Sequence, residues 1–184
     1  RDIGMIFQDP MTSLNPVRRV GSILVESVRR HNTTSKSDAR KTALQALKDV
    51  GVPSPEQRLD AYPHELSGGL RQRVMIALAI INHPSVIVAA EPTTALDATI
   101  QAQILDLLRE RLSDAALVLI THDLGVAAEI CDRVAVMYHG RIVEMGPTAD
   151  ILHNPAHPYT VGLLAAVPHF DFSRQRLPSI PGAP

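Results

Sequence analysis

The chain has 184 residues, of which 45% are apolar and 20% are charged, a composition typical of a folded domain and unlike that of a disordered segment. Lysine and arginine total 18 against 19 acidic residues, so no basic excess points to nucleic acid, and we expect no nucleic-acid partner. The longest apolar run, Val74 to Ile81, is far shorter than the roughly 20 residues of a membrane-spanning helix. The single cysteine, Cys131, indicates a reducing compartment and a cytosolic protein.

Strand-like and helix-like stretches alternate along the chain, which predicts an α/β fold with a mainly parallel sheet. We predict strands over 3–7, 86–90 and 116–121, the last two buried, and a hairpin of 134–138 with 141–144 around His139-Gly140. We predict helices near 20–30, over 39–50, from Ser67 to about Asn82, and over 124–131. The helix over 39–50 is expected to be capped by Ser37 and ended by Gly51. A further helix is expected to begin at the cap Asp97 and to carry an apolar face from Ile100 to Leu112. Residues 53–63 read as a loop, Pro147 and Pro155 as helix openings, and the tail from Pro168 as extended.

A serine and two glycines, Ser67-Gly68-Gly69, stand at the start of the predicted helix that runs to Asn82. Glycines let an anion approach the backbone, and the first-turn N–H groups and the helix dipole favour negative charge. The segment therefore predicts a phosphate contact. The alternative is a plain helix cap, since serine caps helices often.

Polar side chains follow three of the predicted strands: Gln8, Glu91 and His122. Ligands of open α/β sheets bind at the carboxyl ends of the strands, where a carboxylate such as Glu91 can orient an attacking water. The alternatives are a surface acid at Glu91 and a structural histidine at His122. Three polar groups at one sheet edge favour an active site.

In this order the motifs resemble those of the nucleotide-binding subunit of ABC transporters. Ile6 to Pro10 resembles the Q-loop, and Leu66 to Gln72 resembles the signature, with Leu70 and Arg71 inserted before the usual glutamine position. Val86 to Glu91 resembles the Walker B strand with the catalytic glutamate. Thr94 to Asp97 resembles the D-loop, and His122 resembles the switch histidine. The resemblance covers essentially the whole chain. It implies a P-loop NTPase fold with a helical subdomain, and ATP and Mg²⁺ as cofactors.

Three segments are similar to dipeptide and oligopeptide importers in particular: Phe7 to Pro16, Glu91 to Asp97 and His157 to Leu164. Nickel and some sugar importers share these patterns. The resemblance implies an ATP hydrolase on the cytoplasmic face of the inner membrane. Its implied partners are a second ABC ATPase subunit (identical or different), transmembrane permease subunits and, indirectly, an extracytoplasmic peptide-binding protein.

The resemblance also assigns roles to individual residues. Gln8 would sense the γ-phosphate and Mg²⁺ and relay to the membrane subunit, Glu91 would polarise the attacking water, and His122 would contact the γ-phosphate. The implied nucleotide-contacting residues, which include those that act on ATP held by the partner subunit, are Ser67, Gly68, Gly69, Gln72 and Asp97. The implied domains are a partial ATPase core over 1–10 and 81–146, a helical and signature subdomain over 11–80, and a C-terminal helical extension and tail over 147–184.

The sequence departs from the family pattern in two ways. It contains no Gly-x-x-x-x-Gly-Lys-Ser/Thr, the loop that cradles the phosphates, which the family pattern places upstream of Arg1. Ala90 also stands where the Walker B aspartate that holds Mg²⁺ is expected. We therefore expect a piece of a longer protein that is inactive by itself.

Three hypotheses follow from these residues. The first is an ATPase subunit of a peptide importer, supported by Glu91 and His122. The second is a non-hydrolysing subunit that lends its signature to a partner's site, supported by Ala90. The third, an ABC-type ATPase acting on DNA or ribosomes, is disfavoured by the near-neutral charge and by the importer-like segment His157 to Leu164.

Overall fold

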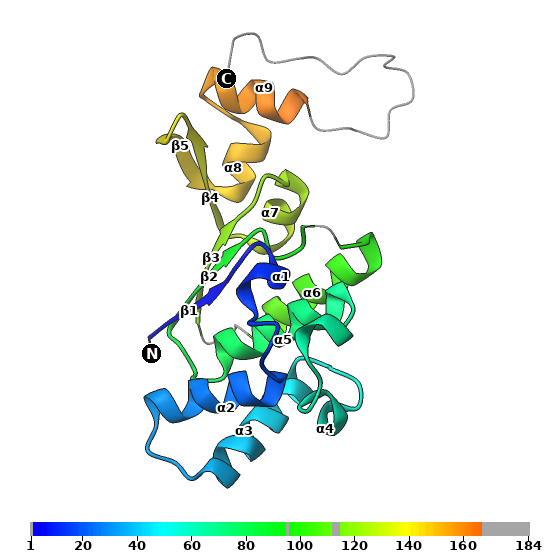
Figure 1. The fold of residues 1–184 in the computed structure, drawn as a ribbon. Helices are drawn as coiled ribbons and strands as arrows, with labels where there is room; N and C mark the ends of the chain where they lie inside the picture. The colour runs from blue at the N-terminus through cyan, green and yellow to red at the C-terminus, as the bar shows by residue number, and fades with distance from the viewer. Residues whose placement is uncertain (1, 95, 112–114, 167–184) are drawn as a thin grey trace. The chain divides into compact units, whose positions relative to one another are not determined.

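The computed structural model describes residues 2–94, 96–111 and 115–166 (Figure 1). These form two compact units, Arg1–Ile120 and Thr121–Pro184, each of which is described by itself. Leu112 and the tail from Pro168 lie outside the described residues. The elements of the first unit are β1 (Ile3–Ile6), α1 (Pro10–Ser13), α2 (Val20–His31), α3 (Lys36–Asp49), α4 (Pro55–Arg58), the 3-10 turn η1 (Pro63–Glu65), α5 (Gly68–Ile80), β2 (Val86–Ala90), α6 (Ala98–Arg111) and β3 (Ala116–Ile120).

The first unit is built on a three-stranded parallel sheet in the order β1-β2-β3. Ile3 lies opposite Val86, and Val86 lies opposite Ala116. The parallel α/β arrangement predicted from the sequence is confirmed. Because β1 and β2 are neighbours in the sheet, the segment from α1 to α5 (residues 10–80) forms one long helical excursion between them.

The third strand corrects one sequence expectation. The apolar run 116–121 predicts a strand buried on both faces, but Val118 is 49% and Ile120 53% exposed. Leu117 and Leu119 instead pack against the core, and β1 alternates in the same way, with Ile3 and Met5 exposed and Ile6 buried. In the part of the chain that the structure describes, side chains cover one face of this sheet. An uninterrupted apolar run does not tell whether one face or both are covered.

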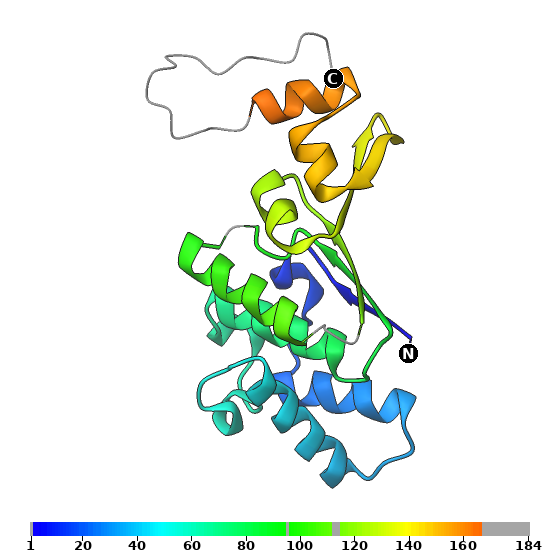
Figure 2. The same ribbon diagram turned by 180° about the vertical axis from the view of Figure 1, so that it is seen from behind.

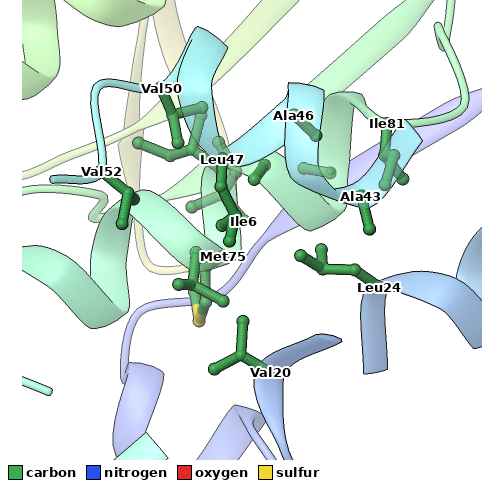
Figure 3. Packing of buried hydrophobic residues seen from close by; sticks show 14 of the residues in the cluster. Ile6, Val20, Leu24, Ala43, Ala46, Leu47, Val50, Val52, Met75 and Ile81 are labelled. Atoms are coloured by element: carbon green, nitrogen blue, oxygen red, sulfur yellow. The ribbon is translucent and has the colours of Figure 1, made fainter. Parts of the chain in front are cut away.

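The core lies between the sheet and the helices α2, α3 and α5 (Figure 3). Leu24 of α2, Leu47 of α3 and Ile6 of β1 are fully buried there. Helices α2 and α3 lie side by side in both views of the ribbon (Figures 1 and 2). The buried residues of each helix gather on one face, at spacings of one, three and four, so both predicted helices are confirmed, including the apolar face predicted for α3.

Two helix boundaries differ from the predictions. Helix α3 is capped by Ser35 and not by Ser37, because the Ser35 Oγ accepts a hydrogen bond from the Asp38 backbone N at 3.0 Å. It ends as expected before Gly51, whose φ of 68° is the left-handed conformation that glycine adopts freely. The predicted loop 53–63 contains the short helix α4, which begins at Pro55.

The second unit contains α7 (Leu124–Ile130), the antiparallel pair β4 (Arg133–Tyr138) and β5 (Arg141–Pro147), α8 (Thr148–His153) and α9 (Pro158–Ala165). His139 and Gly140 have φ of 47° and 73°, as a tight hairpin turn with two positive φ values requires, so the predicted hairpin is confirmed. Pro147 caps α8, but Pro155 opens no helix. Pro158 does so instead, and the His157 Nδ1 accepts a hydrogen bond from the Tyr159 N at 3.1 Å.

Glu144 of β5 holds the start of α9 in place. Its two carboxylate oxygens accept the backbone N–H groups of Ala156 (2.7 Å) and His157 (3.1 Å). The hydrogen bond from the Ala156 N–H is the largest of several interactions that lower the pKa of the Glu144 carboxyl below its usual value.

We therefore expect the start of α9 to loosen as the pH falls through this lowered pKa. The lowered value means that the contribution of Glu144 to stability is present above the unfolded-state pKa and is lost on acidification. Hydrogen exchange at the backbone amides of Ala156 and His157 measures this loosening. In the native chain, protection of these amides should fall as the solution is acidified. In Glu144→Gln, protection should be low at every pH and should lack this acid step. An identical acid step in the variant would contradict the assignment.

Candidate functional site

Glu91 directly follows the central strand β2 and has a left-handed backbone, with φ of 44°. A residue other than glycine adopts this conformation at a cost of about 1–3 kcal/mol, so its surroundings must hold it there. The Glu91 N–H donates to the Ile120 carbonyl at the end of β3 (2.8 Å), and the Glu91 carbonyl accepts from the Thr94 N–H (3.2 Å). These bonds turn the chain sharply at the carboxyl end of the sheet.

The carboxylate of Glu91 is held by two neighbours. Its Oε2 accepts a hydrogen bond from the Gln8 Nε2 at 2.9 Å and another from the Thr94 hydroxyl at 2.8 Å. Gln8 stands just beyond the end of β1, which pairs in parallel with β2, so the topology itself brings Gln8 and Glu91 together. The sequence predicted both residues. It did not predict the contact from Thr94, although a hydroxyl three positions after an acid was a signal for it.

The predicted phosphate-contacting segment begins α5. Ser67 is the helix cap, and its Oγ accepts the Leu70 N–H at 3.4 Å. The plain capping role is therefore present, and the side chain is exposed at the helix start. The two glycines lie next to the start of α6: a Cβ on Gly69 would stand 2.9 Å from the Ile100 Cγ2.

Asp97 caps α6, as predicted, by accepting the Ile100 N–H at 3.0 Å. A Cβ on Gly68 would lie 3.8 Å from Leu96, just before that cap. The N-terminal ends of α5 and α6 thus meet, and they bring the segment Ser67 to Gly69 next to Asp97. Gln72 is not part of this exposed edge: it is 2% exposed inside the core, and no described residue forms a hydrogen bond with its Nε2.

His122 belongs to the second unit, where it precedes α7 and is exposed. The next residue, Asp123, caps α7 by accepting the Gly125 N–H at 2.8 Å. The group assembled within the first unit therefore consists of Gln8, Glu91 and Thr94.

The described residues do not form a complete metal site. Among residues 2–94, 96–111 and 115–166, no three His, Cys, Asp or Glu side chains gather in a way that could hold a metal ion. Ala90, at the strand end beside Glu91, offers only a methyl group. The expected Mg²⁺ therefore lacks its carboxylate ligand here.

Comparison with known proteins identifies the class of this fold and site. The ABC transporter family profile matches residues 1–94, and the profile of the oligopeptide/dipeptide transporter C-terminal region matches residues 143–184. The chain belongs to the ABC transporter family, and the predicted fold class is confirmed.

Within this family, the chain is similar to ATP-binding proteins of dipeptide and oligopeptide transport. Over its full length the chain is 55% identical to the dipeptide transport ATP-binding protein DppD of Bacillus subtilis and spans 55% of that protein. It is also 52% identical, over its full length, to the oligopeptide transport ATP-binding protein OppD of the same organism and spans 52% of it. It is 52% identical, over 98% of its length, to DppD of Escherichia coli and spans 56% of that protein. The chain thus spans about half the length of the curated relatives it matches.

Two solved structures share the fold. One is an ATP-binding cassette in a dimeric post-hydrolysis state bound to ADP and phosphate, with a TM-score of 0.69 and 29% identity, covering 80% of this chain and 63% of that one. The other is a Clostridium perfringens protein described as part of the ABC transporter complex cbiONQ, with a TM-score of 0.69 and 30% identity, covering 82% and 59%.

The contact between α5 and α6 leads to a prediction at Gly69. Gly69→Ala places a methyl group 2.9 Å from the branch methyl of Ile100, whose χ1 is restricted to one strongly preferred rotamer in a helix. We expect the free energy of unfolding to fall by about 1–3 kcal/mol, as for other overpacked sites. Urea unfolding measures the loss. The double variant Gly69→Ala with Ile100→Ala should recover part of it, and no recovery would contradict the proposed clash.

Proposed function

We propose that this chain is part of the ATP-binding subunit of an importer that uses ATP hydrolysis to move peptides across the membrane. The observation that carries the proposal is the hydrogen bond between Gln8 and Glu91, residues that lie 83 positions apart in the sequence. It joins the residues at the Q-loop and catalytic-glutamate positions of the family. The names of the relatives support dipeptides or oligopeptides as the solute.

In this proposal Glu91 orients and polarises the water that attacks the γ-phosphate, a role suited to a carboxylate fixed by two hydrogen bonds. Gln8 and Thr94 position that carboxylate. Ser67, Gly68 and Gly69 contact the γ-phosphate of ATP bound to a partner subunit, with Asp97 beside them. His122 contributes a further γ-phosphate contact. The family pattern places Gln72 among the nucleotide contacts, but its side chain is buried in the core.

The proposed partners are a second ABC ATPase subunit, which the dimeric neighbour supports, and permease subunits, with a peptide-binding protein acting outside the membrane. The proposed location is the cytoplasmic face of the membrane, in contact with the permease. In the described part of the chain, no helix is long and apolar enough to cross a membrane.

Ala90 favours a second candidate, a subunit that binds in the ATPase dimer but does not hydrolyse ATP at its own Walker B strand. P-loop ATPases use an aspartate there to hold Mg²⁺, and an alanine cannot replace that ligand. The signature segment needs neither Ala90 nor a phosphate loop of its own chain, so it could still serve a site on a partner.

An ATPase assay separates the two candidates. The sequence holds no Gly-x-x-x-x-Gly-Lys-Ser/Thr, so the assay joins residues 1–184 to the part of Bacillus subtilis DppD that precedes the matching region; DppD is 55% identical over that region. ATP turnover by the fused protein with Ala90 in place supports the first candidate, a subunit that hydrolyses ATP. Turnover only after Ala90→Asp supports the non-hydrolysing subunit. No turnover in either form would contradict the proposed function.

The solute is tested by transport in cells. In a strain that lacks its own peptide importer ATPase, the same fused subunit carrying Ala90→Asp should restore uptake of a labelled dipeptide. Labelled Ni²⁺ is the matched alternative, because nickel importers share these sequence patterns. Uptake of nickel alone would overturn the peptide assignment and leave the ATPase assignment standing.

A further inference from the structure

A cavity of about 620 Å³ in the helical part of the first unit gathers positive charge. It lies along α2, the start of α3 and the end of α4. Six cationic side chains line it against two carboxylates, Glu26 and Asp60, in a chain whose overall charge is −1. The six cations are Arg18, Arg19, Arg29, Arg30, Lys36 and Arg40.

The two carboxylates pair with three of the six cations. Arg18 pairs with Glu26, and its Nη2 also donates to the Ser22 Oγ at 2.9 Å. Asp60 accepts from the Arg40 Nη2 at 3.1 Å and lies 3.9 Å from the Arg19 Nη1.

The other three cations of the lining are Arg29, Arg30 and Lys36. In the described part of the chain, none of the three has a carboxylate within ion-pair distance, and all are exposed. Lys36 is the first residue of α3, where the helix dipole disfavours a positive charge, so helix stability does not explain its presence. Like charges from two helices thus face one cavity without compensation.

The chemistry of the lining selects the kind of ligand. Five of the six cations are arginines, whose planar guanidinium groups bind phosphate oxygens in pairs. The floor is apolar where Gly21, Val25 and Leu59 meet, and the volume lies within the usual range of about 300–1,000 Å³ for small-molecule sites. Gly21 keeps this floor tight, because a Cβ there would stand 2.8 Å from the Leu59 carbonyl oxygen.

We propose that this cavity binds a phosphate-bearing anion, with Arg29, Arg30 and Lys36 as its main contacts. The site is separate from the Gln8, Glu91 and Thr94 group: no residue is shared, and all of its lining comes from residues 18–60. The proposal therefore does not depend on the ATPase assignment. A soluble phosphorylated molecule and a phospholipid headgroup offer the same chemistry, and the experiment distinguishes them.

The first arm of the test titrates sodium tripolyphosphate into residues 1–184 by calorimetry. We expect binding that weakens as salt is added. Lys36→Glu and the double variant Arg29→Glu with Arg30→Glu should each weaken it by about tenfold or more, as expected for the loss of charged contacts. Arg141→Glu, an exposed charge reversal in β5 of the second unit, is the matched control and should leave binding unchanged.

Lys36→Glu also separates binding from folding. A negative charge on the first turn of α3 favours the helix dipole, so the thermal midpoint should hold or rise while affinity falls. Glu91→Gln should bind tripolyphosphate like the native chain, which keeps this test independent of the proposed ATPase.

The second arm measures cosedimentation of the chain with phosphatidylglycerol vesicles, with phosphatidylcholine vesicles as the control. Soluble polyglutamate, titrated by calorimetry, tests whether any polyanion binds. Tripolyphosphate binding with the expected variant pattern supports the site with a free phosphate ligand. Cosedimentation with phosphatidylglycerol alone, lost in the same variants, supports it with a lipid headgroup. Three outcomes would overturn the proposal: binding of polyglutamate alone, an equal effect of Arg141→Glu, and no binding of any probe.

Discussion

Replacing Glu91 with glutamine is expected to lower ATP turnover by about 10²- to 10⁴-fold, the usual range for loss of a positioned general base. The measurement uses the fused subunit carrying Ala90→Asp, because the native strand end supplies no metal ligand. Glutamine has nearly the shape of glutamate, and a hydrogen bond from Thr94 to the new amide oxygen stays feasible. The loss should therefore appear in kcat and leave KM for ATP nearly unchanged.

A matched control tests whether the position matters. Glu110→Gln removes a carboxylate from an exposed site near the end of α6 and should leave kcat unchanged. If Glu91→Gln kept full turnover in the same background, another group would have to activate the water, and the assignment of Glu91 would be wrong.

Adding one methyl group at Gly4 is expected to destabilise the first unit severely. A Cβ there would stand 2.5 Å from the Ala79 carbonyl oxygen of α5 and 3.1 Å from the Pro84 Cγ. A backbone oxygen inside a helix cannot rotate away, so β1 must separate from α5. The cost should reach or exceed the roughly 1–3 kcal/mol of ordinary overpacking.

Urea unfolding of Gly4→Ala measures this loss, with Gly68→Ala as control. A Cβ on Gly68 meets only Leu96, at an ordinary 3.8 Å, and alanine favours a helix over glycine, so that variant should hold or gain stability. Because β1 leads to Gln8, Gly4→Ala should also disturb the bond to Glu91. Equal midpoints for the two variants would show that β1 does not pack as closely as described.

The regular elements could be predicted because their signals are local. Apolar residues at helical spacing predicted α3 and α5, and the pair His139-Gly140 predicted the hairpin. The α3 cap failed although its bond, from the Asp38 N–H to the Ser35 Oγ, is local, whereas the start of α9 depends on a contact from a distant part of the sequence. The start of α9 at Pro158 and not near Pro155 is set partly by Glu144, which reaches across from β5 to the amides of Ala156 and His157.

The candidate site was predictable to the extent that topology alone determines it. Residues that follow neighbouring parallel strands must emerge at one edge, which placed Gln8 beside Glu91. The contact from Thr94 was missed: the spacing of three from Glu91 was a weak signal, and the contact also depends on the left-handed backbone at Glu91 that turns residue 94 back toward the carboxylate. The exposed side of β3 was missed because an apolar sequence does not show which faces are covered.

The pairing of β1 with β2 has a consequence for synthesis on the ribosome. Ile3 finds its partner Val86 only after the intervening residues have been made, which takes roughly 4–16 s at a rate of about 5–20 residues per second. Helices α2 and α3 pack on each other within that interval, whereas β1, with its apolar Ile3, Met5 and Ile6, waits for its partner β2. A nascent chain stalled before residue 86 should therefore protect α2 and α3 from protease while β1 stays cleavable, and would be a natural client for a chaperone at the tunnel exit.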